Sequence, residues 1–94
     1  MDKVVIVYTM KGCPYCEMIK EQLNETGIEY YVRDIHDYED EFDMFCEIVG
    51  NDYVPAFMLV EDADSDNPKP KLFSPEGDFN TIEEGVEIIK NFIL

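Results

Sequence analysis

The segment that decides the fold reads "KVVIVYTMKGCPYCEMIK" and runs from residue 3 to residue 20. Its first part, residues 3–9, is a β-branched run without polar alternation, which is typical of a strand buried on both faces. A helix is predicted over residues 12–27, because Pro14 suits a first helical turn and Gly27 suits a helix end. The segment therefore predicts a strand, a turn that holds two cysteines, and a helix that begins at those cysteines.

The rest of the chain extends this order of elements. A second strand is predicted over residues 28–35, and strand, helix and strand in so short a chain imply a right-handed parallel crossover. Apolar residues at helical spacing predict helices over 38–50 and 82–94. Strands over 54–61 and 69–74 are close enough in sequence to form an antiparallel hairpin. The predicted fold class is α/β, in the order βαβαββα, with a four-stranded mixed sheet flanked by helices.

Length and charge narrow the classes of protein. With 94 residues, the chain is expected to form a single domain, 1–94. Seven basic and twenty-two acidic residues give a net charge of −15, which repels phosphate backbones and anionic lipid surfaces. No apolar run approaches the roughly 18 to 20 residues that span a membrane. We expect a soluble, cytoplasmic monomer with no nucleic-acid ligand and no membrane contact.

Much of the acidic charge lies in two segments, residues 34–43 and 61–66. We interpret both segments as solvated faces, and the alternative is that one of them docks on a basic partner. The number of cysteines, three, is odd, which argues against a secreted framework in which every thiol is paired. In a reducing compartment, two cysteines at this spacing more often bind a metal or carry out catalysis.

The predicted helix start favours an anion on the first sulfur. Cys13 lies over the unsatisfied amides of the first turn, and Lys11 adds a positive charge nearby. We expect the amides of Tyr15 and Cys16 to donate charge-assisted hydrogen bonds to that sulfur. Cys13 would then face solvent and act as the attacking nucleophile. Cys16, one turn further in and more shielded, would act as the resolving thiol.

Two other interpretations of the cysteine pair stay open. A closed structural disulfide would remove little entropy from the unfolded chain, because the loop that it closes is so small. A zinc site could recruit Cys13, Cys16, His36 and Cys46, but no second close pair mirrors the first one. Cys46 lies on an apolar helical stripe and His36 in an acidic loop. We therefore favour a redox pair and predict no metal site.

Three segments carry a likeness to a known family. "VYTMKGCPYCEMIK" (7–20) resembles the active-site segment of the glutaredoxins, "YVPAF" (53–57) resembles their segment with a cis-proline, and "EGDFNTIEE" (76–84) resembles the glycine turn into their last helix. With the order of elements, the likeness covers essentially the whole chain. It implies the thioredoxin-like fold and a glutathione-dependent thiol-disulfide oxidoreductase, an enzyme with glutathione as co-substrate and no tightly bound cofactor.

The resemblance also implies roles for residues near the cysteines. Cys13 matches the nucleophile that forms a mixed disulfide with glutathione, and Cys16 matches the cysteine that resolves it. Tyr15 would lie beside the glutathione sulfur. Val54 would pair its backbone with the cysteinyl unit of glutathione, and Pro55, in cis, would hold that turn. Without a ligand role, Tyr15 would pack on its helix and the bond before Pro55 would be an ordinary trans bond.

At the last helix, the resemblance implies an anion site. Asn80 and Thr81 match the positions that receive the γ-glutamyl carboxylate of glutathione, and their alternative role is that of helix caps. Three departures put the affinity for glutathione in question, and the first is the acidic hairpin over residues 61–71, which is longer than usual in the family. Where many members have two glycines, this chain has Gly77 and Asp78, so a carboxylate is expected near the ligand. Lys11 stands two positions before the first cysteine, whereas the family's basic residue usually stands three before it.

The partners implied by the resemblance are glutathione and disulfide-containing proteins, with ribonucleotide reductase as one possible acceptor of electrons. Two alternatives remain. The first is a thioredoxin-like reductant that a reductase enzyme recharges. The second is a module that holds a [2Fe-2S] cluster between two subunits through the first cysteine and glutathione, which the tyrosine in CPYC disfavours by resemblance.

Overall fold

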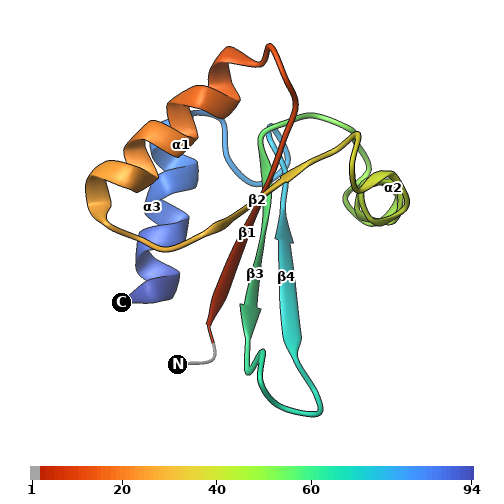
Figure 1. Ribbon diagram of the computed structural model, residues 1–94, viewed down its shortest axis with the longest axis vertical. Coiled ribbons are helices and arrows are strands. Elements are labelled where there is room, and N and C mark those ends of the chain that lie inside the picture. Colours follow the sequence, from red (N-terminus) through yellow and green to blue (C-terminus); the bar gives the residue numbers. More distant parts are fainter. Residues whose placement is uncertain (1–2) are drawn as a thin grey trace.

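The computed structural model describes residues 3–94. Within these residues the elements follow the predicted order βαβαββα, which confirms the predicted α/β fold class (Figure 1). The strands are β1 (Val4–Thr9), β2 (Tyr31–Asp34), β3 (Ala56–Glu61) and β4 (Lys69–Phe73). The helices are α1 (Pro14–Thr26), α2 (Glu39–Val49) and α3 (Ile82–Ile93).

The four strands form one mixed sheet in the order β2-β1-β3-β4. β1 and β2 are parallel, with Val7 opposite Val32, so the crossover through α1 joins parallel neighbours as predicted. β3 is antiparallel to both of its neighbours, and Phe57 lies between Val7 on β1 and Phe73 on β4. The predicted hairpin of β3 and β4 is therefore confirmed, and β2 and β4 are the two edges of the sheet.

Helices cover both faces of this sheet. α1 and α3 lie side by side on one face, and α2 covers the other (Figure 1). Alternate side chains of β1 contribute to both cores: Val5 and Val7 pack with α1 and α3, whereas Ile6 and Tyr8 pack with α2. The two-sided burial of β1 explains why its sequence has no polar alternation.

The helical spacing of Met18, Ile19 and Leu23 in the sequence predicts one buried stripe on α1, and the structure differs from that stripe in one residue. Ile19 and Leu23 are entirely buried as predicted, and Cys16 continues their line toward the start of the helix. Met18, which was expected on the same stripe, is 38% exposed, because one residue of helical rotation moves it to the flank of that line. The helix ends, as predicted, at Gly27, whose φ of +74° lies in the left-handed region.

β2 is shorter than the predicted strand over residues 28–35. The ladder with β1 begins only at Tyr31, opposite Ile6. Ile28 and Tyr30 pack against the core under α1 and α3 before the strand starts. Their apolar side chains therefore reflect burial in the crossover rather than pairing in the sheet.

A polar cluster joins the three elements β1, β2 and α2. The hydroxyl of Tyr8 donates a hydrogen bond to the carboxylate of Glu41, and Nη1 of Arg33 donates to both oxygens of that carboxylate at 2.6 Å. Burial raises the pKa of Tyr8, and the hydrogen bond to Glu41 raises it further. The side chain of Tyr8 is 1% exposed, so Glu41 is the partner that satisfies a buried hydroxyl.

The hairpin of β3 and β4 forms the exposed end of the sheet. Asp64 and Asp66 in its loop are exposed, as expected for a solvated acidic face. β4 carries Pro70 between Lys69 and Lys71, and all three of these residues are exposed. Across residues 3–94, no helix combines the length and the apolar character that crossing a membrane requires.

Candidate active site

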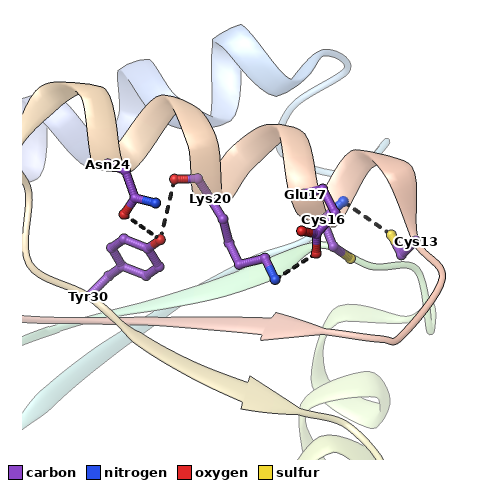
Figure 2. A network of polar contacts seen from close by, with 6 residues as sticks. All are labelled: Cys13, Cys16, Glu17, Lys20, Asn24 and Tyr30. Carbon is purple, nitrogen blue, oxygen red and sulfur yellow. Dashed lines mark hydrogen bonds and ion pairs between the residues drawn. The ribbon is translucent and has the colours of Figure 1, made fainter.

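Cys13 is the residue that caps α1. Its backbone is extended, with φ −97° and ψ 105°, and its Sγ accepts a hydrogen bond from the amide of Cys16 at 3.2 Å (Figure 2). This confirms the expected contact between the first sulfur and an amide of the first turn. The second expected donor, the amide of Tyr15, makes no hydrogen bond to this sulfur in the described part of the chain. Within the described residues, the sulfur of Cys13 thus accepts a hydrogen bond only from the amide of Cys16, the third residue of α1.

The exposure of the first sulfur corrects one expectation. Cys13 is 8% exposed and does not face solvent broadly, because its side chain folds over the helix start toward Cys16. Sγ also lies 4.0 Å from the carbonyl oxygen of Val54, to which the thiol form can donate. Cys16 is entirely buried, as predicted. Of the two sulfurs, only that of Cys13 is open to a reactant from outside.

The second thiol is held in its protonated form. Burial raises the pKa of Cys16 to about 12, and its hydrogen bond with Cys13 raises it as well, while a backbone hydrogen bond with Met10 acts in the opposite direction. At neutral pH, Cys16 is therefore a thiol and a poor nucleophile. The two sulfurs, one helical turn apart, differ in the way that attacking and resolving roles require.

A cavity of about 250 Å³ opens beside the start of α1. It brings together five of the six residues expected to bind glutathione: Tyr15, Val54, Pro55, Asn80 and Thr81. The Val54-Pro55 peptide bond is cis, as the resemblance implied, and β3, expected from residue 54, begins after it at Ala56. Three segments that are far apart in sequence thus meet at one site.

Lys11, the sixth expected residue, does not line this cavity. It is exposed in the turn between β1 and α1, and it has no ion-pair partner among residues 3–94. Proximity to Cys13 in the sequence therefore does not place the lysine in the wall of this cavity. The described residues that line the cavity include no lysine or arginine.

The start of α3 is a capping box. Oγ1 of Thr81 accepts a hydrogen bond from the amide of Glu84 at 3.1 Å. In return, Oε1 of Glu84 accepts from the amide of Asn80 at 2.7 Å and from that of Thr81 at 3.3 Å. Thr81 is thus a helix cap, as in the alternative left open above. The amides expected to receive a ligand carboxylate hold the carboxylate of Glu84 instead.

The carboxylate that enters the cavity is not the one expected. Asp78 points elsewhere, because its Oδ2 accepts a hydrogen bond from the amide of Ser74 at 2.8 Å. The cavity is lined instead by Glu76, whose φ of +69° is unusual for a residue with a side chain. Sequence reasoning missed Glu76 and its neighbours Pro75 and Phe79. The signal was the turn sequence "SPEG", in which proline and glycine flank the glutamate.

The described residues offer no assembled metal site. Within residues 3–94, no three His, Cys, Asp or Glu side chains lie together so that they could hold an ion. Cys46 packs with the core under α2, and His36 lies exposed in the loop before that helix. Cys13, Cys16 and Cys46 are all free thiols. The four ligands considered from the sequence are therefore not assembled into a zinc site.

The chain has a thioredoxin-like fold with two free thiols, Cys13 and Cys16, at the start of its first helix. The Glutaredoxin family model matches residues 5–59, more than half of the chain, and the chain belongs to this family. The matched stretch contains β1, the cysteine pair, α1 and the cis-proline segment. The match thus covers the cysteine pair and the cis-proline side of the cavity, and the lining residues from Pro75 to Ile82 lie beyond it.

Two relatives illustrate the range of similar proteins. Over 55 residues, or 58% of the chain, the sequence is 35% identical to N-acetyl-S-hydroxy-L-cysteine reductase from Bacillus subtilis, and the match spans 59% of that protein's length. The crystal structure of the holo form of glutaredoxin C1 from Populus tremula x tremuloides is similar with a TM-score of 0.59. That similarity covers 93% of this chain and 74% of the other at 19% identity, and it supports the fold alone.

Proposed function

We propose that the protein is a glutathione-dependent thiol-disulfide oxidoreductase, with Cys13 as the attacking and Cys16 as the resolving cysteine. The observation that carries the proposal is the position of Cys13 Sγ, 3.2 Å from the amide of Cys16 and 4.0 Å from the carbonyl oxygen of Val54, a residue that lines the cavity of about 250 Å³. The amide and the helix start stabilise negative charge on that sulfur. The cavity offers space for the group that would be attached to it.

The reaction begins with attack on a disulfide. The Cys13 thiolate attacks one sulfur of the substrate, the substrate's S–S bond breaks, and the released thiolate takes up a proton. Cys13 is now joined to half of the substrate in a mixed disulfide. Cys16 loses its proton, attacks Cys13 and releases that half as a second thiol. Two glutathione molecules then reduce the Cys13–Cys16 disulfide to the dithiol and leave as glutathione disulfide.

The environment of Cys16 suits its place in this sequence of steps. While Cys13 is anionic, its charge and hydrogen bond both contribute to the raised pKa of Cys16. Formation of the mixed disulfide removes that charge. Cys16 then loses its proton more readily, so the resolving attack follows the first attack rather than preceding it.

The cavity supports a place for glutathione in the mixed disulfide. With its sulfur on Cys13, the cysteinyl unit would lie along the backbone of Val54, next to the cis-proline Pro55. Tyr15, 61% exposed at the cavity wall, would cover the sulfur. Asn80 and Thr81 would lie at the γ-glutamyl end. Lys11 would contribute only through its positive charge in the preceding turn.

The substrates would be protein disulfides and glutathione mixed disulfides, with ribonucleotide reductase as one candidate, in the cytoplasm and with the protein as a monomer. Glutathione would act as a co-substrate, with no tightly bound cofactor. Protein purified without oxygen should accordingly be colourless, and colour would favour the cluster-binding alternative.

A second candidate substrate comes from the Bacillus subtilis relative, whose name is that of a reductase of an S-hydroxy-cysteine derivative. In a sulfenic acid R–S–OH, Cys13 would attack the sulfur, and the hydroxyl would take up a proton and leave as water. Cys16 would then release the thiol R–SH as before. Such a small substrate would leave much of the cavity of about 250 Å³ unfilled.

The test is glutathione-dependent reduction of a small mixed disulfide by the protein and two matched variants. Cys13→Ser should abolish turnover, because the attacking sulfur is lost. Cys46→Ser makes the same change at a thiol that packs under α2, and it should keep full turnover. Activity of Cys13→Ser equal to that of the unaltered protein would refute the proposal. Turnover only with a reductase enzyme, and none with glutathione, would favour the thioredoxin-like alternative.

A further inference from the structure

The start of α3 suggests which disulfides the site prefers. We infer that Glu84 occupies the backbone amides of Asn80 and Thr81 beside the cavity, so that the enzyme favours disulfides of aminothiols that lack a carboxylate over those of glutathione. The inference rests on the proposed function, because it concerns the group attached to Cys13 in the mixed disulfide. It adds a specificity-determining residue that does not touch the reacting sulfurs.

The first observation is the occupation of the amides at the helix start. Oε1 of Glu84 lies 2.7 Å from the amide nitrogen of Asn80 and 3.3 Å from that of Thr81. A helix start attracts negative charge, and here the chain supplies that charge itself. A ligand carboxylate can reach the same amides only by displacing Glu84. The displaced carboxylate would then lie close to a second negative charge without its hydrogen bonds.

The second observation is the charge of the cavity wall. Among the described residues that line the cavity, one side chain is charged, that of Glu76, and it is negative. Four of the seven basic residues have polar partners elsewhere, and these are Lys3, Lys20, Arg33 and Lys69. The cavity thus presents no cation to a carboxylate. It presents one carboxylate, that of Glu76, to an ammonium group.

These two observations define the chemistry of the favoured ligand. Glutathione carries an ammonium group and two carboxylates, so its net charge is negative at neutral pH, and its carboxylates would meet negative charge at Glu76 or Glu84. Cysteamine has a thiol and an amine, is protonated at neutral pH and lacks a carboxylate. In a mixed disulfide with Cys13, its ammonium group can approach Glu76, where opposite charge favours binding. Cysteamine represents the class of aminothiols in the experiment below.

The experiment measures oxidation of the reduced protein by two disulfides, cystamine and glutathione disulfide. In each reaction the dithiol and one RSSR molecule give the Cys13–Cys16 disulfide and two RSH molecules, so no other reductant is needed. Each rate constant is divided by that of dithiothreitol with the same disulfide, which corrects for intrinsic reactivity. We expect the corrected rate constant of the protein to be higher with cystamine.

The variants separate the role of Glu84 from general charge. Glu84→Ala frees the amides of Asn80 and Thr81. It should raise the ratio of the corrected rate constants, glutathione disulfide to cystamine, by about tenfold. A tenfold change corresponds to about 1.4 kcal/mol, which one charge-assisted hydrogen bond can supply. Glu87→Ala removes the same charge from an exposed position further along α3 and should change the ratio little. Glu84→Gln should give an intermediate ratio, because its side chain can still accept from the amides.

The outcomes distinguish this inference from the proposed function. Equal ratios for Glu84→Ala and Glu87→Ala, with cystamine no better than glutathione disulfide for the unaltered protein, would overturn the inference alone. A protein that reacts with neither disulfide would overturn the proposed function. If circular dichroism shows that Glu84→Ala is unfolded, the test uses Glu84→Gln with Glu87→Gln as its control. Equal ratios of the corrected rate constants, glutathione disulfide to cystamine, in these two variants would then overturn the inference.

Discussion

At the scale of single residues, the two sulfurs of the site owe their difference to one turn of helix. Cys13 caps α1 and accepts the amide of Cys16, whereas Cys16 points inward and is entirely buried. Burial raises the pKa of Cys16 to about 12. Because of this raised pKa, the free energy of unfolding should depend on pH.

We expect the free energy of unfolding to fall in alkaline solution because of Cys16. An unfolded cysteine ionises near pH 8.5, whereas folded Cys16 stays protonated up to about pH 12. Its contribution is therefore complete below about pH 8.5 and is lost as the pH rises toward 12, at up to about 1.4 kcal/mol per pH unit. Urea unfolding at a series of pH values from about 7 to 11 measures this slope.

Cys16→Ala provides the comparison for that slope. The variant should lose stability less steeply over the same range, even if its stability at neutral pH is lower. Tyr8 and Cys46 also have pKa values raised by burial, so a residual slope of the same sign should remain. Identical slopes for the variant and the unaltered protein would mean that Cys16 ionises in the folded state as easily as in the unfolded state.

The sequence predicted where single residues lie in the fold better than it predicted their hydrogen-bond partners. Cys13 at the helix start and Cys16 one turn inside follow from the preferences of a first helical turn, in which Pro14 marks the position. The partners of Asp78 and Glu84 could not be predicted. Each carboxylate has several amides within reach, and the choice depends on the path of the turn before α3.

At the scale of elements, one hydrogen-bonded cluster joins β1, β2 and α2. Glu41 accepts from Tyr8 of β1 and from Arg33 of β2. Burial alone would raise the pKa of Glu41, but the hydrogen bonds from Tyr8 and Arg33 outweigh burial, so its pKa is lowered. The ionised form of Glu41 therefore stabilises the fold above its unfolded pKa of about 4.3, and that contribution is lost in acid.

We expect Glu41→Ala to lower the free energy of unfolding by about 1 to 3 kcal/mol, the cost of a buried hydroxyl without a partner. Arg33 adds less, because its side chain is 30% exposed and its charge is partly screened. In a protein that already carries Tyr8→Phe, Glu41→Ala should lower the free energy of unfolding by less, since no hydroxyl is left unpaired. Urea unfolding of the four proteins of this cycle measures the coupling. Costs that are equal in both backgrounds would contradict it.

The sequence pattern predicted the burial of the strands better than it predicted where each strand begins. The β-branched run of β1 predicted its two-sided burial, because only a strand between two helical layers needs such a run. β2 was predicted to begin at residue 28, although the ladder begins at Tyr31. Apolar patterns report burial, and Ile28 is partly buried against a helical layer without being paired in the sheet.

At the scale of the whole molecule, the net charge of −15 is spread over a small volume. The molecule measures 34 × 30 × 23 Å. At about 0.01 M salt, charges interact over about 30 Å, a distance comparable to the whole molecule, whereas at about 0.1 M they interact over about 10 Å. Salt in this range therefore screens repulsion between opposite sides of the protein.

We expect the melting temperature to rise by about 5 °C between about 0.01 M and 0.1 M sodium chloride, which corresponds to about 1 kcal/mol. Near pH 4.1, the pI of the sequence, the net charge vanishes and the rise should disappear. Differential scanning calorimetry at both pH values measures the effect. A melting temperature that falls with salt at neutral pH would mean that ion pairs such as Lys20–Glu17 outweigh the repulsion.

The two open edges of the sheet affect how copies of the protein meet in concentrated solution. The apolar strands β1 and β3 lie in the middle, where both of their sides are already paired. On β4, Pro70 lacks an N–H, and the flanking residues Lys69 and Lys71 repel an identical neighbour. A strand from another chain therefore cannot pair readily with the edge strand β4. Concentrated samples should resist fibril growth, although the central strands β1 and β3 are rich in amyloid-prone residues.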